Sequence, residues 1–150
     1  MKRTMGILIA ALLLGVAATA GADDKAILKK AHEEKGAPAI SGKISVEKAK
    51  GANAYTVAEL YANGARLNGK TVVVRAKVVK VSPQIMGKNW IHLRDGSGEP
   101  EKGNNNLVVT SQDLPMVGDV VTAGGTLRKD KDFGSGYKYS VIMEEANVKP

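Results

Sequence analysis

The stretch from Asn89 to Gly98, which reads Asn-Trp-Ile-His-Leu-Arg-Asp-Gly-Ser-Gly, contains the only tryptophan and one of the two histidines of the chain. The alternation of a β-strand would place Trp90, His92 and Arg94 on one face and the two aliphatic residues between them on the other. A ring flanked by cations is a surface on which the bases of a single strand can stack. This stretch is therefore the first candidate for binding.

Other basic and aromatic residues are predicted to extend this surface. Arg75 and Lys77 belong to a valine-rich strand that would lie beside Trp90 if the two strands pair. Alternation places them on the face opposite Val72, Val74, Ala76 and Val78. The two expected loops, Ser82–Lys88 and Lys129–Gly136, and their flanks supply the remaining candidates. These are Lys88, Lys129, Lys131, Phe133, Tyr137 and Lys138.

Each candidate has a purely structural alternative. Large aromatic side chains are more often buried than presented to solvent, so Trp90 could instead pack under a helix at Thr56–Leu67 or under the N-terminal leader. A charged hairpin loop is often no more than a solvated turn. A covered Trp90 would leave only the basic loops as binding elements.

Metal binding and catalysis find little support in the residue types. With His92 and His32 as the only histidines and no cysteine, a tight zinc or haem site would need carboxylates such as Asp95. The segment Asp95–Glu99 lacks the acidic spacing of an EF-hand and is interpreted as a turn. There is no G-x-S-x-G serine, no nucleophilic cysteine and no distinct carboxylate pair. We expect a non-enzymatic binding protein without metal or cofactor.

Residues 1–22 have the three regions of a secretory signal peptide. A basic start is followed by an apolar run, Met5–Val16, and by A-x-A sites at Ala18–Ala20 and Ala20–Ala22. The apolar run is shorter than the roughly 20 residues of a membrane-spanning helix, so an uncleaved anchor is the less favoured alternative. With no cysteine near the cleavage region, a lipoprotein is excluded. The predicted location is periplasmic or secreted, with no membrane span after cleavage.

The composition favours contact with anions. The net charge of the 150-residue chain is +7, and loss of Lys2 and Arg3 with the signal peptide would leave +5. Nucleic acid, anionic lipid, cell-wall polymers and acidic proteins are all compatible with this charge. Because the exported chain has no cysteine, packing alone must stabilise it, and this favours a closed sheet with few free edges.

Residues 23–54 are predicted to be a flexible leader with a short helix over Asp24–Lys35. Residues 55–150 form the predicted domain, which begins with a helix. Thr56 is its expected N-cap and Glu59, three residues later, completes a capping box. Asn63-Gly64 either ends or interrupts this helix.

The rest of the domain is predicted to be all-β. Gly124-Gly125 indicates a bulge or sharp bend in one strand. Strands are expected at Lys70–Val81, Asn89–Asp95, Leu107–Thr110, Val120–Arg128 and Tyr137–Val148.

The run from Trp90 to Asp95, followed by Gly98, resembles the second-strand signature of OB-fold anticodon-binding and helicase-associated domains. The resemblance covers Leu67–Val148, with Gly-Lys-Thr-Val-Val-Val before the signature and Val-Gly-Asp-Val-Val after it. It implies a five-stranded OB-fold barrel in which the aromatic residue at Trp90 stacks on a base. The chain departs from the pattern because Gln112–Gly118 is too short for the helix that often joins strands three and four.

The chain also resembles a group of small exported bacterial OB-fold proteins, some of which are encoded near periplasmic multihaem cytochrome c nitrite reductases. The pieces Ile85–Trp90 and Lys131–Tyr137 recur in that group. This resemblance implies binding of single-stranded nucleic acid or another polyanion through the Trp90 face and the basic loops. The alternatives are a protein-interaction factor for a periplasmic respiratory complex and, without specific support, a binder of small cations or an envelope-stress factor.

Overall fold

The computed structural model describes Ile40 and residues 42–150 of the chain. The predicted signal peptide, the predicted helix Asp24–Lys35 and His32 lie outside these residues. No helix in the described part of the chain has the length and apolar character needed to cross a membrane.

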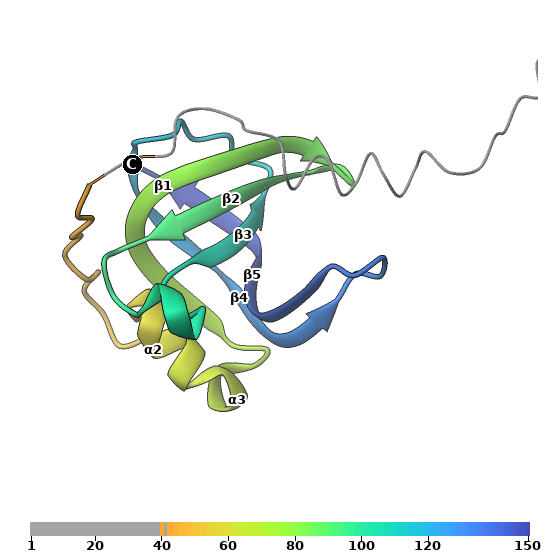
Figure 1. Ribbon diagram of the computed structural model, residues 1–150, viewed down its shortest axis with the longest axis horizontal. Helices are drawn as coiled ribbons and strands as arrows, with labels where there is room; N and C mark the ends of the chain where they lie inside the picture. The colour runs from red at the N-terminus through yellow and green to blue at the C-terminus, as the bar shows by residue number, and fades with distance from the viewer. Residues whose placement is uncertain (1–39, 41) are drawn as a thin grey trace, which may run out of the picture. The chain divides into compact units, whose positions relative to one another are not determined.

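The described chain is mainly β-structure, as predicted, and its five strands form a closed sheet. The strands are β1 (Thr71–Ile85), β2 (Lys88–Arg94), β3 (Leu107–Ser111), β4 (Val120–Asp132) and β5 (Lys138–Lys149). Their order is β1-β2-β3-β5-β4, with β4 pairing again with β1 (Figure 1). The β3–β5 pair is parallel and the other four pairs are antiparallel. Closure leaves no long unpaired edge around the sheet.

The core lies inside the closed sheet and is formed by alternate residues of each strand. On β1 the predicted inner face is confirmed, because Val72, Val74, Ala76 and Val78 are fully buried. Matching aliphatic residues from the other four strands complete this core. They include Ile91, Leu93, Leu107, Val109, Val121, Ala123, Leu127, Val141 and Met143.

The first strand is longer than predicted. It continues to Ile85, so most of the predicted loop Ser82–Lys88 is strand and only Met86-Gly87 turns the chain. The pairing register with β2 shifts between Val78 and Lys80, as expected of a β-bulge. A bulge offsets the alternation by one residue, which the regular pattern of the sequence does not reveal.

The predicted helix is present and is divided at Asn63. Its parts are α2 (Val57–Ala62) and α3 (Gly64–Leu67), and the short 3-10 helix η1 (Pro100–Lys102) follows later in the chain. The capping box is confirmed: the hydroxyl of Thr56 accepts from the N–H of Glu59, and the carboxylate of Glu59 accepts from the N–H of Thr56.

The turn after β2 holds the start of α2. One carboxylate oxygen of Asp95 accepts from the N–H of Val57 at 2.9 Å, and the hydroxyl of Ser97 accepts from the N–H of Ala58 at 2.9 Å. The other oxygen of Asp95 accepts from the N–H of Ser97. Because these bonds satisfy N–H groups that a helix leaves open, Asp95 and Ser97 connect the sheet to the helix.

Gly124-Gly125 marks a bend in β4, as predicted. A Cβ on Gly125 would lie 2.8 Å from the carbonyl oxygen of Glu144 on β5, so only glycine allows this approach. The pairing of β4 with β5 shifts register between Gly124 and Thr126. The bend therefore lets β5 pair with β4 along its whole length and with β3 for part of it.

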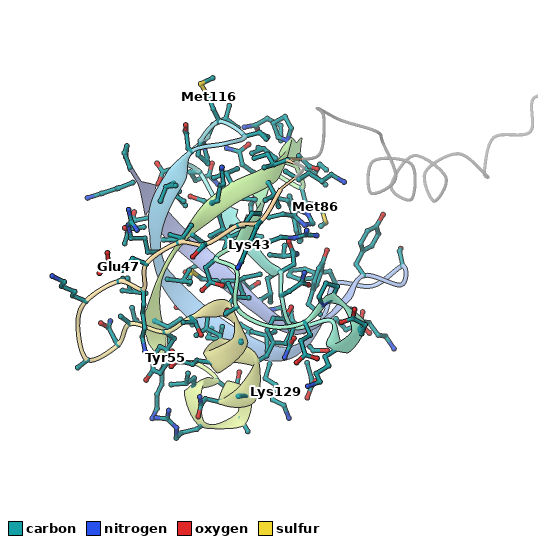
Figure 2. The ribbon with its side chains drawn as sticks, turned by 60° about the vertical axis from the view of Figure 1, so that its left-hand side comes forward. Lys43, Glu47, Tyr55, Met86, Met116 and Lys129 are labelled. Carbon is teal, nitrogen blue, oxygen red and sulfur yellow. The ribbon has the colours of Figure 1, made fainter. Side chains whose placement is uncertain are left out.

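Residues 42–54, part of the predicted leader, run along the outer side of β1 (Figure 2). The N–H of Val46 donates to the carbonyl of Asp95, and the guanidinium of Arg75 donates to the carbonyl of Glu47 at 3.2 Å. Ala54 forms a parallel bridge with Val73. This segment therefore lies beside the outer face that carries the predicted binding residues.

Candidate binding face

The outer side of β1 and β2 carries a group of basic residues, here named the cationic face. Its members are Arg75, Lys77, Lys80, His92 and Arg94. In the sheet Lys77 is the pairing partner of Arg94, and Lys80 is the partner of His92. Paired residues of antiparallel strands point to the same side, so the bulge after Val78 brings Lys80 onto the face of Lys77.

Lys77 and Arg94 carry positive charges without an acidic partner among the described residues. Neither forms an ion pair with a carboxylate of the described residues. Lys77 is half-buried and Arg94 is exposed. Two adjacent cations without a neutralising carboxylate repel each other and attract an external anion.

His92 is half-buried beside these cations. Its Nδ1 lies 3.3 Å from the side-chain amide nitrogen of Asn106. Tyr61 reaches the same loop, where its hydroxyl donates to the carbonyl of Asn106 at 2.6 Å, and burial raises the pKa of Tyr61. The contact with Asn106 makes His92 a positioned member of the face.

Trp90 is covered, contrary to the prediction that its ring is available for stacking. Only 4% of the residue is exposed, and among the described residues its cover comes from neither the helix Thr56–Leu67 nor the segment 42–54. Its neighbours are Phe133 and Tyr139, at ring-centroid distances of 5.2 Å and 6.0 Å. Phe133 directly follows β4 and Tyr139 lies at the start of β5, where the two strands continue beyond the closed part of the sheet.

The Trp90 cluster is a second apolar core, on the outside of the sheet. Trp90 packs there with Val108 and Ile142, and the indole N–H donates to the carbonyl of Ile85 at 2.9 Å. Burial raises the pKa of Tyr139, and the nearby Tyr137 adds to that shift. The two pieces Ile85–Trp90 and Lys131–Tyr137 therefore meet in space, and their contact is structural.

The extended end of β4 and β5, from Arg128 to Tyr139, is here named the hairpin (Figure 1). Its basic residues have acidic partners. Arg128 and Lys131 lie 3.5 Å and 3.6 Å from the carboxylate of Glu144, whose side chain is 12% exposed. Lys129 pairs with Asp130 and Lys138 with Asp132. The predicted loop cations are therefore largely neutralised, by the hairpin's own aspartates and by Glu144.

Lys88 lies apart from the other predicted cations, at the start of β2. It borders a hollow of about 300 Å³ that is also lined by Asp113 and Glu145. Thr110 lines the same hollow, and its hydroxyl is buried without a hydrogen-bond partner among the described residues. Because the hollow has charges of both signs, it does not extend the cationic face.

The structure adds residues that the sequence pattern did not single out. Lys80 joins the face only through the bulge in β1, and the exposed Lys43 is carried by the segment that crosses this side (Figure 2). Asn89 is buried, and its side chain bonds to the N–H of Gln84 and to the carbonyls of Gln112 and Asp113. The only signal in the sequence for Asn89 is that this polar residue directly precedes an aromatic residue, Trp90.

Within the described residues, no three histidine, cysteine or acidic side chains are grouped so that they could hold a metal ion. Comparisons with protein-family models, curated proteins and solved structures returned no match. The geometry of the cationic face is therefore the basis for a functional interpretation.

Proposed function

We propose that this chain is an exported OB-type barrel that binds single-stranded nucleic acid or another polyanion through its cationic face. The strand order and the parallel β3–β5 pair support the OB-type assignment, since this fold is a five-stranded Greek-key barrel. The basic composition and the predicted signal peptide support an exported binder of anions.

One observation carries the proposal: Lys77 and Arg94 are adjacent and have no acidic partner among the described residues. Maintaining like charges side by side costs free energy in the unbound protein, and a bound phosphate chain would relieve the repulsion. Lys80 and Arg75 lie along the same strand and extend the positive charge.

Titration of the purified protein with a labelled oligonucleotide at low and high salt tests the proposal. We expect binding that weakens steeply with salt, because each phosphate neutralised by a cation releases counterions. Lys77→Ala and Arg94→Ala should weaken binding, whereas Lys129→Ala on the hairpin serves as the matched control. Absence of binding at low salt would reject the proposal.

A second candidate function is a protein-interaction factor for a periplasmic multihaem cytochrome system. Trp90 cannot serve as its interface anchor, because the ring is covered. Exposed apolar residues favour this function instead: Leu114 is 61% and Met116 73% exposed in the connection between β3 and β4. Val120, 38% exposed, is the pairing partner of Lys77, so this apolar group adjoins the cationic face.

Binding to a purified multihaem cytochrome c nitrite reductase distinguishes the two functions. If the second function holds, Leu114→Ser with Met116→Ser abolishes cytochrome binding and leaves oligonucleotide binding unchanged, since exposed positions tolerate polar side chains and these changes leave the net charge unaltered. Absence of any cytochrome binding by the unaltered protein would remove the second candidate.

A further inference from the structure

We infer that the ligand is read through its chain of phosphate groups, without stacking of its bases. This inference rests on the proposed function and deepens it, because it defines the class of ligand as a linear phosphate polyanion. A nucleic acid backbone and an inorganic polyphosphate chain share this chemistry.

The first support is that the aromatic rings are already packed inside the protein. Trp90 is 4% exposed and its indole N–H is already bonded to the carbonyl of Ile85. Phe133 and Tyr139 also contact each other, with ring centroids 5.9 Å apart. Two of the rings predicted to bind, Trp90 and Phe133, are therefore packed against each other and against Tyr139.

The second support is the make-up of the cationic face. Its outward members on β1 and β2 are basic, and the neighbouring outward residues on β4 are Thr122, beside Arg75, and Val120, beside Lys77. No aromatic residue occupies these paired positions. A base lying over this face would meet aliphatic and hydroxyl groups, whereas a phosphate would meet ammonium and guanidinium groups.

The third support is the spacing of the charges. Alternate residues of a strand lie about 6.6 Å apart, so Arg75 and Lys77 project at a regular interval. The bulge after Val78 continues this row with Lys80, and Arg94 doubles it on the adjacent strand. A linear polymer with one charge per unit matches such a row, and no side group of the polymer is needed for the match.

The test compares three ligands with matched numbers of phosphates: a labelled oligothymidylate, an abasic strand of the same length, and inorganic polyphosphate as a competitor. We expect the thymidylate and the abasic strand to bind within about twofold of each other, because stacking contributes nothing. We expect Trp90 emission to stay unchanged during both titrations, since the ring remains covered.

The outcomes separate the inference from the proposed function. An abasic strand that binds at least about tenfold more weakly, or quenching of Trp90 by thymidylate alone, would overturn the inference while the proposed function stands. Failure of all three ligands overturns both. Competition by polyphosphate supports recognition of phosphates alone, and binding of the abasic strand without such competition supports recognition of the sugar-phosphate backbone.

Lys77→Gln and Arg94→Gln, with Lys129→Gln as the control, complete the design. Backbone recognition requires each face variant to weaken the thymidylate and abasic strands by the same factor. A variant that weakens only the thymidylate would contradict it, since the bases would then be in contact with that residue.

Discussion

The cationic face and the hairpin are both rich in lysine and arginine, but they use these residues differently. On the hairpin, Glu144 lies near both Arg128 and Lys131, and the two outer lysines each have an aspartate partner. On the face, Lys77 and Arg94 lie side by side without a carboxylate among the described residues. The number of basic residues in a segment therefore does not measure the charge available to a ligand.

The two regions also differ in what their cations stabilise. On the hairpin, the ammonium of Lys131 lies 5.4 Å from the centre of the Phe133 ring. This ring is one of those that cover Trp90. The charges of the hairpin therefore help to hold the second apolar core together. On the face, the guanidinium of Arg75 donates to the carbonyl of Glu47 in the segment 42–54, and Lys77 and Arg94 form no ion pair with a carboxylate of the described residues.

Removing Trp90 should have the largest effect, and the effect should be on stability. Trp90→Ala deletes the centre of the second core and should lower the free energy of unfolding by about 3–5 kcal/mol. Urea unfolding followed by circular dichroism measures this change. Trp90→Phe keeps an aromatic ring but loses the bond to Ile85, and should cost about 1–2 kcal/mol. Wild-type stability of Trp90→Ala would show that the second apolar core contributes nothing to stability.

Charge reversal should separate the two regions in binding. Lys77→Glu combined with Arg94→Glu should lower oligonucleotide affinity about tenfold or more at low salt, and flatten the salt dependence by about 0.7 per lost phosphate contact. The control, Lys129→Glu combined with Lys138→Glu, makes the same change in net charge on the hairpin. Fluorescence anisotropy measures both, and equal losses would mean that net charge alone governs binding.

Removal of Glu144 should make the hairpin resemble the face. Glu144→Gln frees Arg128 and Lys131 from their carboxylate, so polyanion affinity should rise about twofold to threefold while stability falls by about 1 kcal/mol. Glu145→Gln is the matched control, because it changes the net charge equally at an exposed neighbouring position. Equal gains in affinity for the two variants would contradict a role of the ion pairs.

The smallest effect concerns Lys48, which lies in the segment 42–54 beside the face. The carboxylate of Glu59 neutralises its charge. A hydrogen bond from Lys48 lowers the pKa of Glu59, and the N–H of Thr56 adds to the shift. A lowered folded-state pKa contributes stability above the ordinary pKa of glutamate, and this is lost as the pH falls through the folded value. Both side chains are 43% exposed, so the contribution is below about 1 kcal/mol.

Glu59→Gln keeps the capping box, since glutamine can replace glutamate there, and removes only the charge. The difference in unfolding free energy between the protein and this variant should be present at pH 7 and should shrink at pH 3. A difference in unfolding free energy that is independent of pH would mean that packing, and not the charge of Glu59, causes the difference.

Local patterns in the sequence predicted much of the fold. The alternation in β1 identified its inner face, and Thr56 with Glu59 identified the start of the helix, because these signals act between near neighbours. Gly124-Gly125 located the bend in β4. The predicted C-terminal ends of β1 and β4 were wrong, because both strands continue into hairpins whose length depends on tertiary contacts.

The binding face was predicted less well, for a different physical reason. The prediction that Trp90, His92 and Arg94 share one side is correct, but the cover over Trp90 comes from Phe133 and Tyr139, more than forty positions along the chain. Alternation shows which side of a strand a residue occupies and not what lies on top of it. The pairing of cations with Glu144 is equally non-local.

The bonds from Asp95 and Ser97 to the start of α2 have a consequence for local opening. A helix of six residues is too short to persist alone, and the amides of its first turn would ordinarily exchange with solvent deuterium almost at once. Here the N–H groups of Val57 and Ala58 are bonded to side chains 38 and 39 positions away. These amides can exchange only when the turn after β2 opens, so the helix and the sheet belong to one cooperative unit.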